Sequence, residues 1–298
     1  MTTTTSPGAR ATSPGLPGAG MTVGLFITCI NDVMFPQTGV AVTTLLERLG
    51  CKVEFPRKQT CCAQMTTNTG YFDEGIPTVR QYVRAFGDYD YIVAPSGSCV
   101  AAVRDQHPML AEYAGDSGLA KEVEHTSQCT YDLPEFLIDI LGVTDVGAYF
   151  PHRVTYHPSC HGKRLLNLGD RPYDLLRHVK GMTLVDLPMA EQCCGFGGTF
   201  CIKNPDMSAA MANDKARHVR ETEAEYVVAG DNSCLMNIGG MLSRQRSGIE
   251  TIHLAEILAH TQDSASASAS AAGPEPAAGA GFDPAATDDT LDMVGGDR

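Results

Sequence analysis

The sequence predicts an α/β protein of two tandem, pseudo-symmetric cysteine-rich halves, each a small and mostly parallel sheet flanked by helices. Two observations predict this class. A cysteine pattern occurs twice along the chain, and in both copies short runs of β-forming residues alternate with segments of helical periodicity. Such alternation favours a parallel sheet with covering helices, because parallel strands need a crossover between them.

Each copy of the pattern is a lone cysteine, a Cys-Cys pair and another lone cysteine. The steps between these markers are 32 and 37 residues in the first copy and 33 and 40 in the second, although the intervening sequence has diverged. The markers are Cys29, Cys61, Cys62 and Cys99 in the first half, and Cys160, Cys193, Cys194 and Cys234 in the second.

Short apolar runs predict a strand before each marker, and helical periodicity separates the strands. Since the carboxyl ends of parallel strands open onto one crevice, we expect the four cysteines of a half to meet at one mouth. The predicted strands are residues 23–28, 52–55 and 91–94 in the first half and 154–156, 183–187 and 226–229 in the second; the predicted helices include 40–49, 77–86 and the similar closing helices 133–137 and 254–258.

Both ends of the chain are of low complexity. Residues 1–20 are mostly Thr, Ser, Pro and Gly, and residues 262–298 pass from an Ala-Ser alternation into an acidic stretch, so both are predicted to be disordered tails. The first half is predicted at residues 21–145 and the second at 150–260. The sequence leaves open whether translation starts at Met1 or Met21.

Charge and composition exclude several classes of function. A formal net charge of -13 argues against a nucleic-acid partner, because phosphate binding needs clustered Lys and Arg. No apolar run is long enough for a membrane span, and no signal peptide pattern is present, so a cytoplasmic location is expected. In that reducing compartment eleven cysteines indicate metal or redox chemistry rather than disulfides.

Four thiolates that converge on one point are what an iron–sulfur cluster or a tetrahedral zinc ion requires. Neighbouring cysteines on an extended strand point to opposite faces, so the backbone must turn for both sulfurs of a pair to reach one centre. Gly195 gives this freedom after the second pair, whereas Ala63 follows the first. We therefore expect the second half to hold its centre more tightly. Burial as small hydrophobic residues explains a single cysteine but not a repeated spacing.

These residues resemble the cysteine-rich CCG-domain family, known from the cysteine-rich subunit of heterodisulfide reductase and the iron–sulfur subunit of glycolate oxidase. The similarity runs from about Met21 to His260 and is greatest to members that take part in lactate utilization. The stretches that carry it are Leu25–Cys29, Leu46–Cys51 and Pro95–Cys99 in the first half, and Ser159–His161, Cys193–Phe200 and Cys234–Gly240 in the second.

The resemblance implies an iron–sulfur subunit of a system that oxidises L-lactate to pyruvate. It also implies partners, namely other lactate-utilization subunits that include a ferredoxin-type iron–sulfur protein. The family's fullest motif ends in C-x-x-C, but here its first position is Ser96 in one half and Asp231 in the other. Four marker thiols in a half suffice for an ordinary [4Fe–4S] cluster but not for the five-thiol, non-cubane arrangement. The chain is therefore expected to bind one or two [4Fe–4S] clusters.

Other residues carry weaker signals. Cys201 is either a spare ligand or a packed thiol, and the histidines at 157 and 161 are either turn residues or donors near Cys160. Lys163 and Arg164 offer positive charge beside a thiolate-ligated centre. No flavin fingerprint and no catalytic residue are identified, so hydride removal would need another subunit or another cofactor.

Two alternative functions remain at this point. Thiolate sites also suit zinc, so a zinc-binding scaffold without redox activity is one alternative. A heterodisulfide-reductase-like catalyst is the other, and the missing fifth cysteines argue against it.

Overall fold

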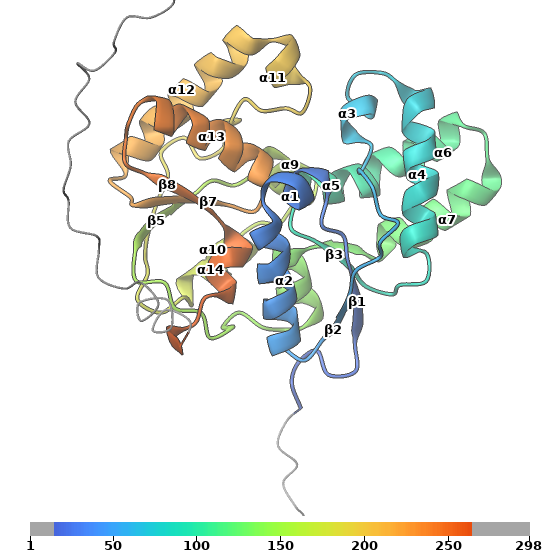
Figure 1. Ribbon diagram of the computed structural model, residues 1–298, viewed down its shortest axis with the longest axis horizontal. Coiled ribbons are helices and arrows are strands. Elements are labelled where there is room, and N and C mark those ends of the chain that lie inside the picture. Colours follow the sequence, from blue (N-terminus) through green and yellow to red (C-terminus); the bar gives the residue numbers. More distant parts are fainter. Residues whose placement is uncertain (1–14, 264–298) are drawn as a thin grey trace, which may run out of the picture. The chain divides into compact units, whose positions relative to one another are not determined.

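The computed structural model describes residues 15–263, in which strands and helices alternate along the chain (Figure 1). The predicted tails, residues 1–20 and 262–298, lie largely outside the described residues. Residues 17–20 form a turn, and the Gly18 N–H there donates to the Leu49 carbonyl oxygen at 2.9 Å. Between residues 15 and 263, no helix combines the length and apolar character needed to cross a membrane.

The first half contains a sheet of four parallel strands in the order β2-β1-β3-β4. Three of its strands coincide with predicted ones, but the sequence does not predict β4, because its three residues carry no apolar run. The observed β1 ends at Leu25, so a short loop rather than the strand itself leads to Cys29. The strands are β1 Thr22–Leu25, β2 Lys52–Glu54, β3 Ile92–Ala94 and β4 Thr130–Asp132.

The second half repeats this sheet with the order β6-β5-β7-β8, again all parallel. The registers match as well, since Thr22 pairs with Lys52 in the first sheet and Arg153 pairs with Thr183 in the second. The predicted fold class, two tandem α/β halves with parallel sheets, is confirmed. The strands are β5 Arg153–Tyr156, β6 Thr183–Val185, β7 Tyr226–Ala229 and β8 Glu250–His253.

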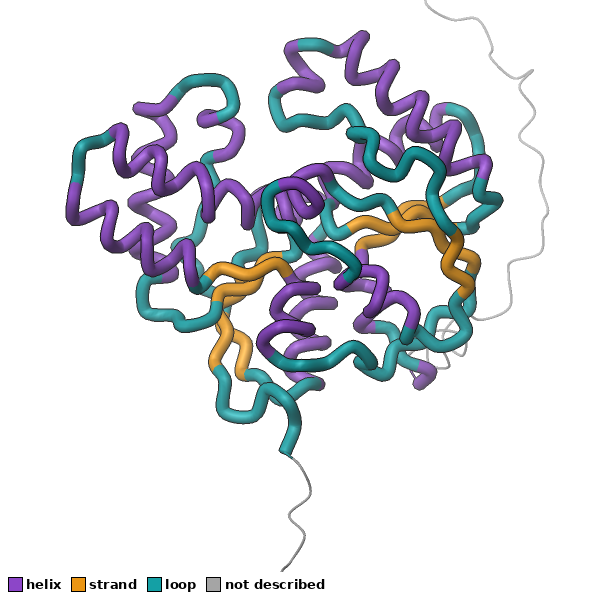
Figure 2. Tube along the Cα trace, turned by 180° about the vertical axis from the view of Figure 1, so that it is seen from behind, coloured by secondary structure: helices purple, strands orange, loops and turns teal. Residues whose placement is uncertain are grey.

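Helices surround both sheets, and Figure 2 shows the two groups of strands with helices between and around them. The predicted helix at 40–49 begins earlier, at Pro36, because proline is favoured in a first helical turn. The helices of the first half are α1 Cys29–Met34, α2 Pro36–Arg48, α3 Gln64–Thr67, α4 Phe72–Phe86, α5 Gly97–Ala101, the π-helical η1 Ala102–Gln106, α6 His107–Tyr113, α7 Ser117–Gln128, α8 Leu133–Glu135 and the π-helical η2 Phe136–Ile140. Those of the second half are α9 Cys160–Arg164, α10 Arg171–Arg177, α11 Phe200–Lys203, α12 Pro205–Glu221, α13 Asn232–Arg244 and α14 Leu254–Ala259.

The closing helix of each half packs against the other half. Helix α14 contacts α2, and α8 contacts α10, so that buried leucines of both halves share one core. Arg48 at the end of α2 donates to the carbonyl oxygens of Leu258 and Ala259 at 2.6 and 2.8 Å, where α14 ends. Arg171 at the start of α10 pairs with Asp139 of η2 at 2.7 Å. The two halves therefore complete each other's hydrophobic core.

Candidate metal centre

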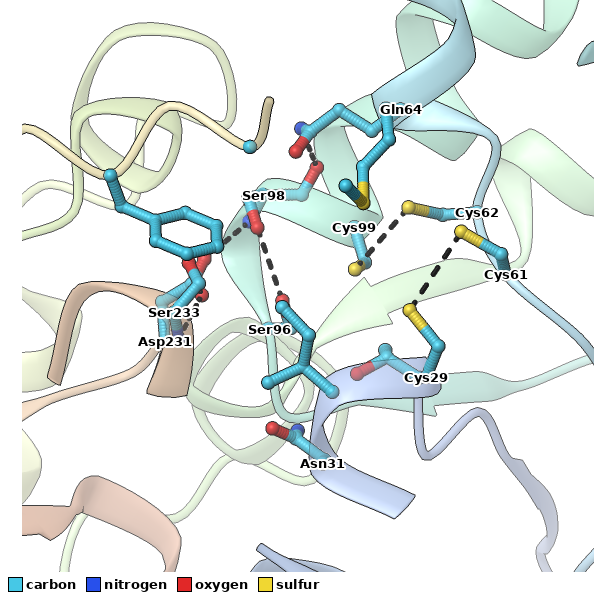
Figure 3. A pocket seen from close by; sticks show the side chains of 15 residues that line it. Cys29, Asn31, Cys61, Cys62, Gln64, Ser96, Ser98, Cys99, Asp231 and Ser233 are labelled. Carbon is cyan, nitrogen blue, oxygen red and sulfur yellow. Dashed lines mark hydrogen bonds between the residues drawn. The ribbon is translucent and has the colours of Figure 1, made fainter. Parts of the chain in front are cut away.

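The predicted thiols of the first half come together at the carboxyl ends of its strands. Cys29 begins α1 just beyond β1, the Cys61–Cys62 pair lies in the loop between β2 and α3, and Cys99 lies in α5 just beyond β3. The Sγ atoms of Cys29 and Cys61 are 3.8 Å apart, and those of Cys62 and Cys99 are 3.4 Å apart. All four sulfurs point into one pocket, as Figure 3 shows.

Hydrogen bonds between these thiols set their protonation. The bond from the Cys29 thiol, followed by one from Cys62, lowers the pKa of Cys61 to about 3. Cys29 is the donor in that bond, so the bond stabilises its protonated thiol and, together with burial, raises the pKa of Cys29 far above its usual range. Hydrogen bonds with Cys61 and Cys99 raise the pKa of Cys62 in the same way. Cys61 is thus the thiol of the first group that loses its proton most readily. The thiolate is the form of cysteine that binds metals.

The second half brings its four thiols together in the same way. Cys160 begins α9 beyond β5, Cys193 and Cys194 lie in the loop after β6, and Cys234 lies in α13 beyond β7. The hydrogen bond from Cys160, followed by one from Cys194, lowers the pKa of Cys193 to about 2. In both halves the first member of the Cys-Cys pair therefore has the lowered pKa.

A histidine joins the second group. One ring nitrogen of His157 and the sulfurs of Cys194 and Cys234 all lie within 4.8 Å of one another, and all three residues are buried. Burial lowers the pKa of His157 to about 3, so its imidazole is neutral. The sequence singled out His157 as one of two candidate donors. The other, His161, has its Nδ1 3.6 Å from the Cys160 sulfur.

The residue after each Cys-Cys pair turns the backbone, as predicted. Ala63 has φ 63° and Gly195 has φ 87°, both in the left-handed region that disfavours residues with a side chain. Gly195 has a second constraint, because a Cβ there would lie 2.7 Å from the Ser208 carbonyl oxygen and 2.9 Å from the Met211 Cβ. Glycine is therefore required at 195, and Ala63 holds a strained conformation in the first half.

The positions where the family motif has further cysteines have hydrogen-bonding roles. Ser96 is the N-cap of α5, and its hydroxyl lies 3.2 Å from that of Ser98 (Figure 3). Asp231 is the N-cap of α13, where it accepts from the Ser233 N–H, and it also accepts from the Ser98 N–H of the other half at 3.0 Å. Both side chains are buried. The bond between Ser98 and Asp231 joins the two halves at the edge of the first thiol pocket.

Two polar residues near the thiols were not predicted. The Gln64 amide donates to the Ser98 carbonyl oxygen at 2.8 Å beside the first group. Lys215 is fully buried on α12, where its ammonium donates to the carbonyl oxygens of Met189 and Ala190 and lies close enough to the thiols at 193, 194 and 234 to interact with their charge. The only sequence signal for Lys215 is its position on the apolar face of the helix.

The remaining predicted residues lie around these groups. Cys201 donates to the Gly198 carbonyl oxygen at 3.2 Å, Cys51 is buried in the shared core, and the Cys129 sulfur lies 3.8 Å from His125 Nδ1. Lys163 pairs with Glu191 at the surface.

Two pseudo-equivalent groups of four clustered thiols, each at the carboxyl edge of a parallel sheet, define a protein suited to metal or iron–sulfur binding. Comparison with known proteins gives its family. The chain belongs to the cysteine-rich domain (CCG) family, whose model matches residues 23–104 and 154–239, and this confirms the resemblance found in the sequence.

Curated relatives match most of the chain. Lactate utilization protein A of Oceanobacillus iheyensis is 47% identical over 238 residues, which is 80% of this chain and 96% of that protein. Lactate utilization protein A of Geobacillus kaustophilus is 48% identical over 238 residues, 80% of this chain and 98% of that protein. Among solved structures, a match to a glutamate racemase of Bacillus anthracis covers 85% of this chain and 82% of the racemase chain at 9% identity. Its TM-score of 0.32 is too low to indicate a shared fold.

Proposed function

We propose that this protein is the iron–sulfur electron-transfer subunit of a system that oxidises L-lactate to pyruvate. The observation that carries the proposal is the pair of four-thiol groups, one in each half, on matching sheets. The relatives named lactate utilization protein A support the choice of substrate. In this proposal the ligands come from the eight marker cysteines, the halves at residues 21–145 and 150–260 each bind one centre, and the centres are [4Fe–4S] clusters.

The chain's own residues would hold and tune the clusters. Cys61 and Cys193 are the thiols with lowered pKa, and the other thiols of each group would release their protons to solvent as iron binds. Bound clusters would accept and release single electrons. Since no flavin fingerprint is present, the hydride of lactate is removed on another subunit, and a ferredoxin-type iron–sulfur protein is the proposed neighbour in the electron path. A reducing cytoplasm suits the eleven free thiols.

One observation favours a second candidate, a zinc-binding scaffold. Sulfur–sulfur distances of 3.4 and 3.8 Å match the edge of about 3.8 Å for a tetrahedron of ligands about 2.3 Å from one metal ion. A heterodisulfide-reductase-like catalyst has less support, because Ser96 and Asp231 occupy the positions of the further cysteines and form hydrogen bonds there instead.

Anaerobic purification followed by metal and sulfide analysis tests the proposal. We expect brown protein with about four or eight irons and equal sulfide per chain, absorbing near roughly 400 nm from sulfur-to-iron charge transfer. The iron should fall in Cys62→Ser and Cys194→Ser and stay unchanged in the control Cys129→Ser, which lies outside both groups. Colourless protein with stoichiometric zinc would establish the scaffold instead.

Lactate oxidation needs its own measurement. When the protein is combined with the other subunits of the system, we expect L-lactate to reduce its iron–sulfur absorbance. An iron-loaded protein that lactate never reduces would retain the iron–sulfur role but contradict the substrate.

A further inference from the structure

The two halves place chemically different residues at one equivalent position. Thr22 and Arg153 hold the same register in their sheets, and Phe26 and His157 each follow four residues later. Their backbones make the same bond, since the N–H of Phe26 donates to the Val93 carbonyl oxygen at 2.9 Å and the N–H of His157 donates to that of Val228 at 2.7 Å. A phenyl ring and an imidazole therefore occupy matching sites beside the two thiol groups.

In the first half this position belongs to an aromatic core. Phe26 is fully buried, and its ring packs edge-to-face against Tyr82 and Phe86 of α4, with centroids 5.0 and 5.5 Å away. The phenyl ring of Phe26 has no polar atom, so it needs no hydrogen-bond partner there. The scaffold thus accommodates a purely apolar side chain at this position.

In the second half the same position holds an unpartnered polar ring. His157 is 1% exposed, and neither of its ring nitrogens has a hydrogen-bond partner in the described part of the chain. Burying a polar group without a partner is unfavourable, and the first half demonstrates that phenylalanine would avoid that cost. The nearby Lys215 is not its partner, because no hydrogen bond joins the two side chains and the ammonium group donates instead to the carbonyl oxygens of Met189 and Ala190.

The imidazole faces the second thiol group. Its ligand atom and the sulfurs of Cys194 and Cys234 lie within 4.8 Å of one another, in a fully buried cluster. Imidazole and thiolate together form common ligand sets for both zinc and iron. A bound metal would satisfy one of the two unpartnered ring nitrogens.

We propose that His157 is a metal ligand of the second half, acting together with Cys194 and Cys234. The centre of the second half then has mixed imidazole and thiolate ligands, whereas the centre of the first half has thiolates alone. This inference rests on the proposed function for the identity of the metal, but the ligand assignment can be tested with either iron or a single metal ion.

The test compares His157→Phe, which copies the residue of the first half, with the control His161→Phe, which removes the other histidine near Cys160. Each protein is loaded anaerobically with ferrous iron and sulfide, reduced, and measured by pulsed electron paramagnetic resonance for coupling to a ligand ¹⁴N nucleus. We expect the coupling in wild type and in His161→Phe and its loss in His157→Phe. Iron-loaded wild type without the coupling, or His157→Phe with it, overturns the assignment and leaves the iron–sulfur function standing.

If wild type takes up no iron, the proposed function fails, and Co²⁺ tests the ligand by itself. Optical titration should give at least tenfold weaker Co²⁺ binding to His157→Phe than to wild type or His161→Phe. Equal binding refutes the inference. Circular dichroism checks that the variants fold, and His157→Cys, which keeps a ligand at the position, should restore Co²⁺ binding with stronger sulfur-to-metal absorption.

Discussion

Replacing Gly195 by alanine tests how the backbone turn presents both sulfurs of the second pair. Gly195 has φ 87°, and an added Cβ would lie 2.7 Å from the Ser208 carbonyl oxygen and 2.9 Å from the Met211 Cβ. The left-handed conformation costs an L-residue about 1–2 kcal/mol, and overpacking of this kind costs about 1–3 kcal/mol. We therefore expect Gly195→Ala to lower the free energy of unfolding by about 2–5 kcal/mol.

At the equivalent position of the first half the test is the reverse substitution, from alanine to glycine. Ala63→Gly relieves a strain of about 1 kcal/mol at φ 63°, but it removes a buried methyl group worth about 0.8 kcal/mol and makes the unfolded chain more flexible. These contributions nearly cancel, so Ala63→Gly should shift the free energy of unfolding by less than about 1 kcal/mol.

Anaerobic urea denaturation measures both variants. The matched control is Gly240→Ala in α13, because an added Cβ meets nothing within 4 Å there and φ is not positive. This control should be neutral or more stable than wild type. A Gly195→Ala protein that unfolds within about 0.5 kcal/mol of wild type would refute the argument from strain and overpacking.

Three further predictions follow from the thiol groups and from a buried histidine. Cys194→Ser protein keeps only the strained first centre, and Cys62→Ser protein keeps only the second. In a chelator titration the Cys194→Ser protein should lose its iron at the lower chelator concentration, and loss at the same concentration would show that the halves are equivalent. Lys215→Met removes the positive charge near the second group, so a redox titration should show a lower potential for that centre, and an unchanged potential would contradict this role. Burial lowers the pKa of His253 to about 4 in the folded protein, so between pH 6.5 and pH 4 the unfolded chain binds more protons than the folded one. The free energy of unfolding should therefore fall by up to about 3 kcal/mol as the pH drops through that window. His253→Asn, which can still accept from the Ala255 N–H, should reduce that slope, and urea midpoints at pH 7 and pH 5 would measure it.

The sequence predicts the parts of this protein that depend on local pattern. Repeated cysteine spacing and short apolar runs place three strands of each sheet and bring all eight marker thiols to the carboxyl edges. The need for a turn after each Cys-Cys pair is also local, and the positive φ of Ala63 and Gly195 confirms it. These features follow from strand and turn chemistry within a few residues of each cysteine.

Features that depend on distant contacts were not predictable. Strands β4 and β8 are short and partly polar, so only their pairing with β3 and β7 defines them. Lys215 lies on the apolar face of α12, but its burial depends on carbonyl groups of a loop some 25 residues earlier, which the sequence alone does not place beside it. The contrast between Phe26 and His157 becomes visible only when the two sheets are aligned by register.

The exchange of closing helices between the halves has a consequence for the order of events during synthesis. Arg48 donates to carbonyl groups 210 and 211 residues further along the chain, at the end of α14, which leaves the ribosome after all the strands of both sheets. At roughly 5–20 residues per second, helix α2 waits about 10–40 s for α14. The first half therefore emerges with part of its apolar surface uncovered and reaches its final packing only after the second half has been made.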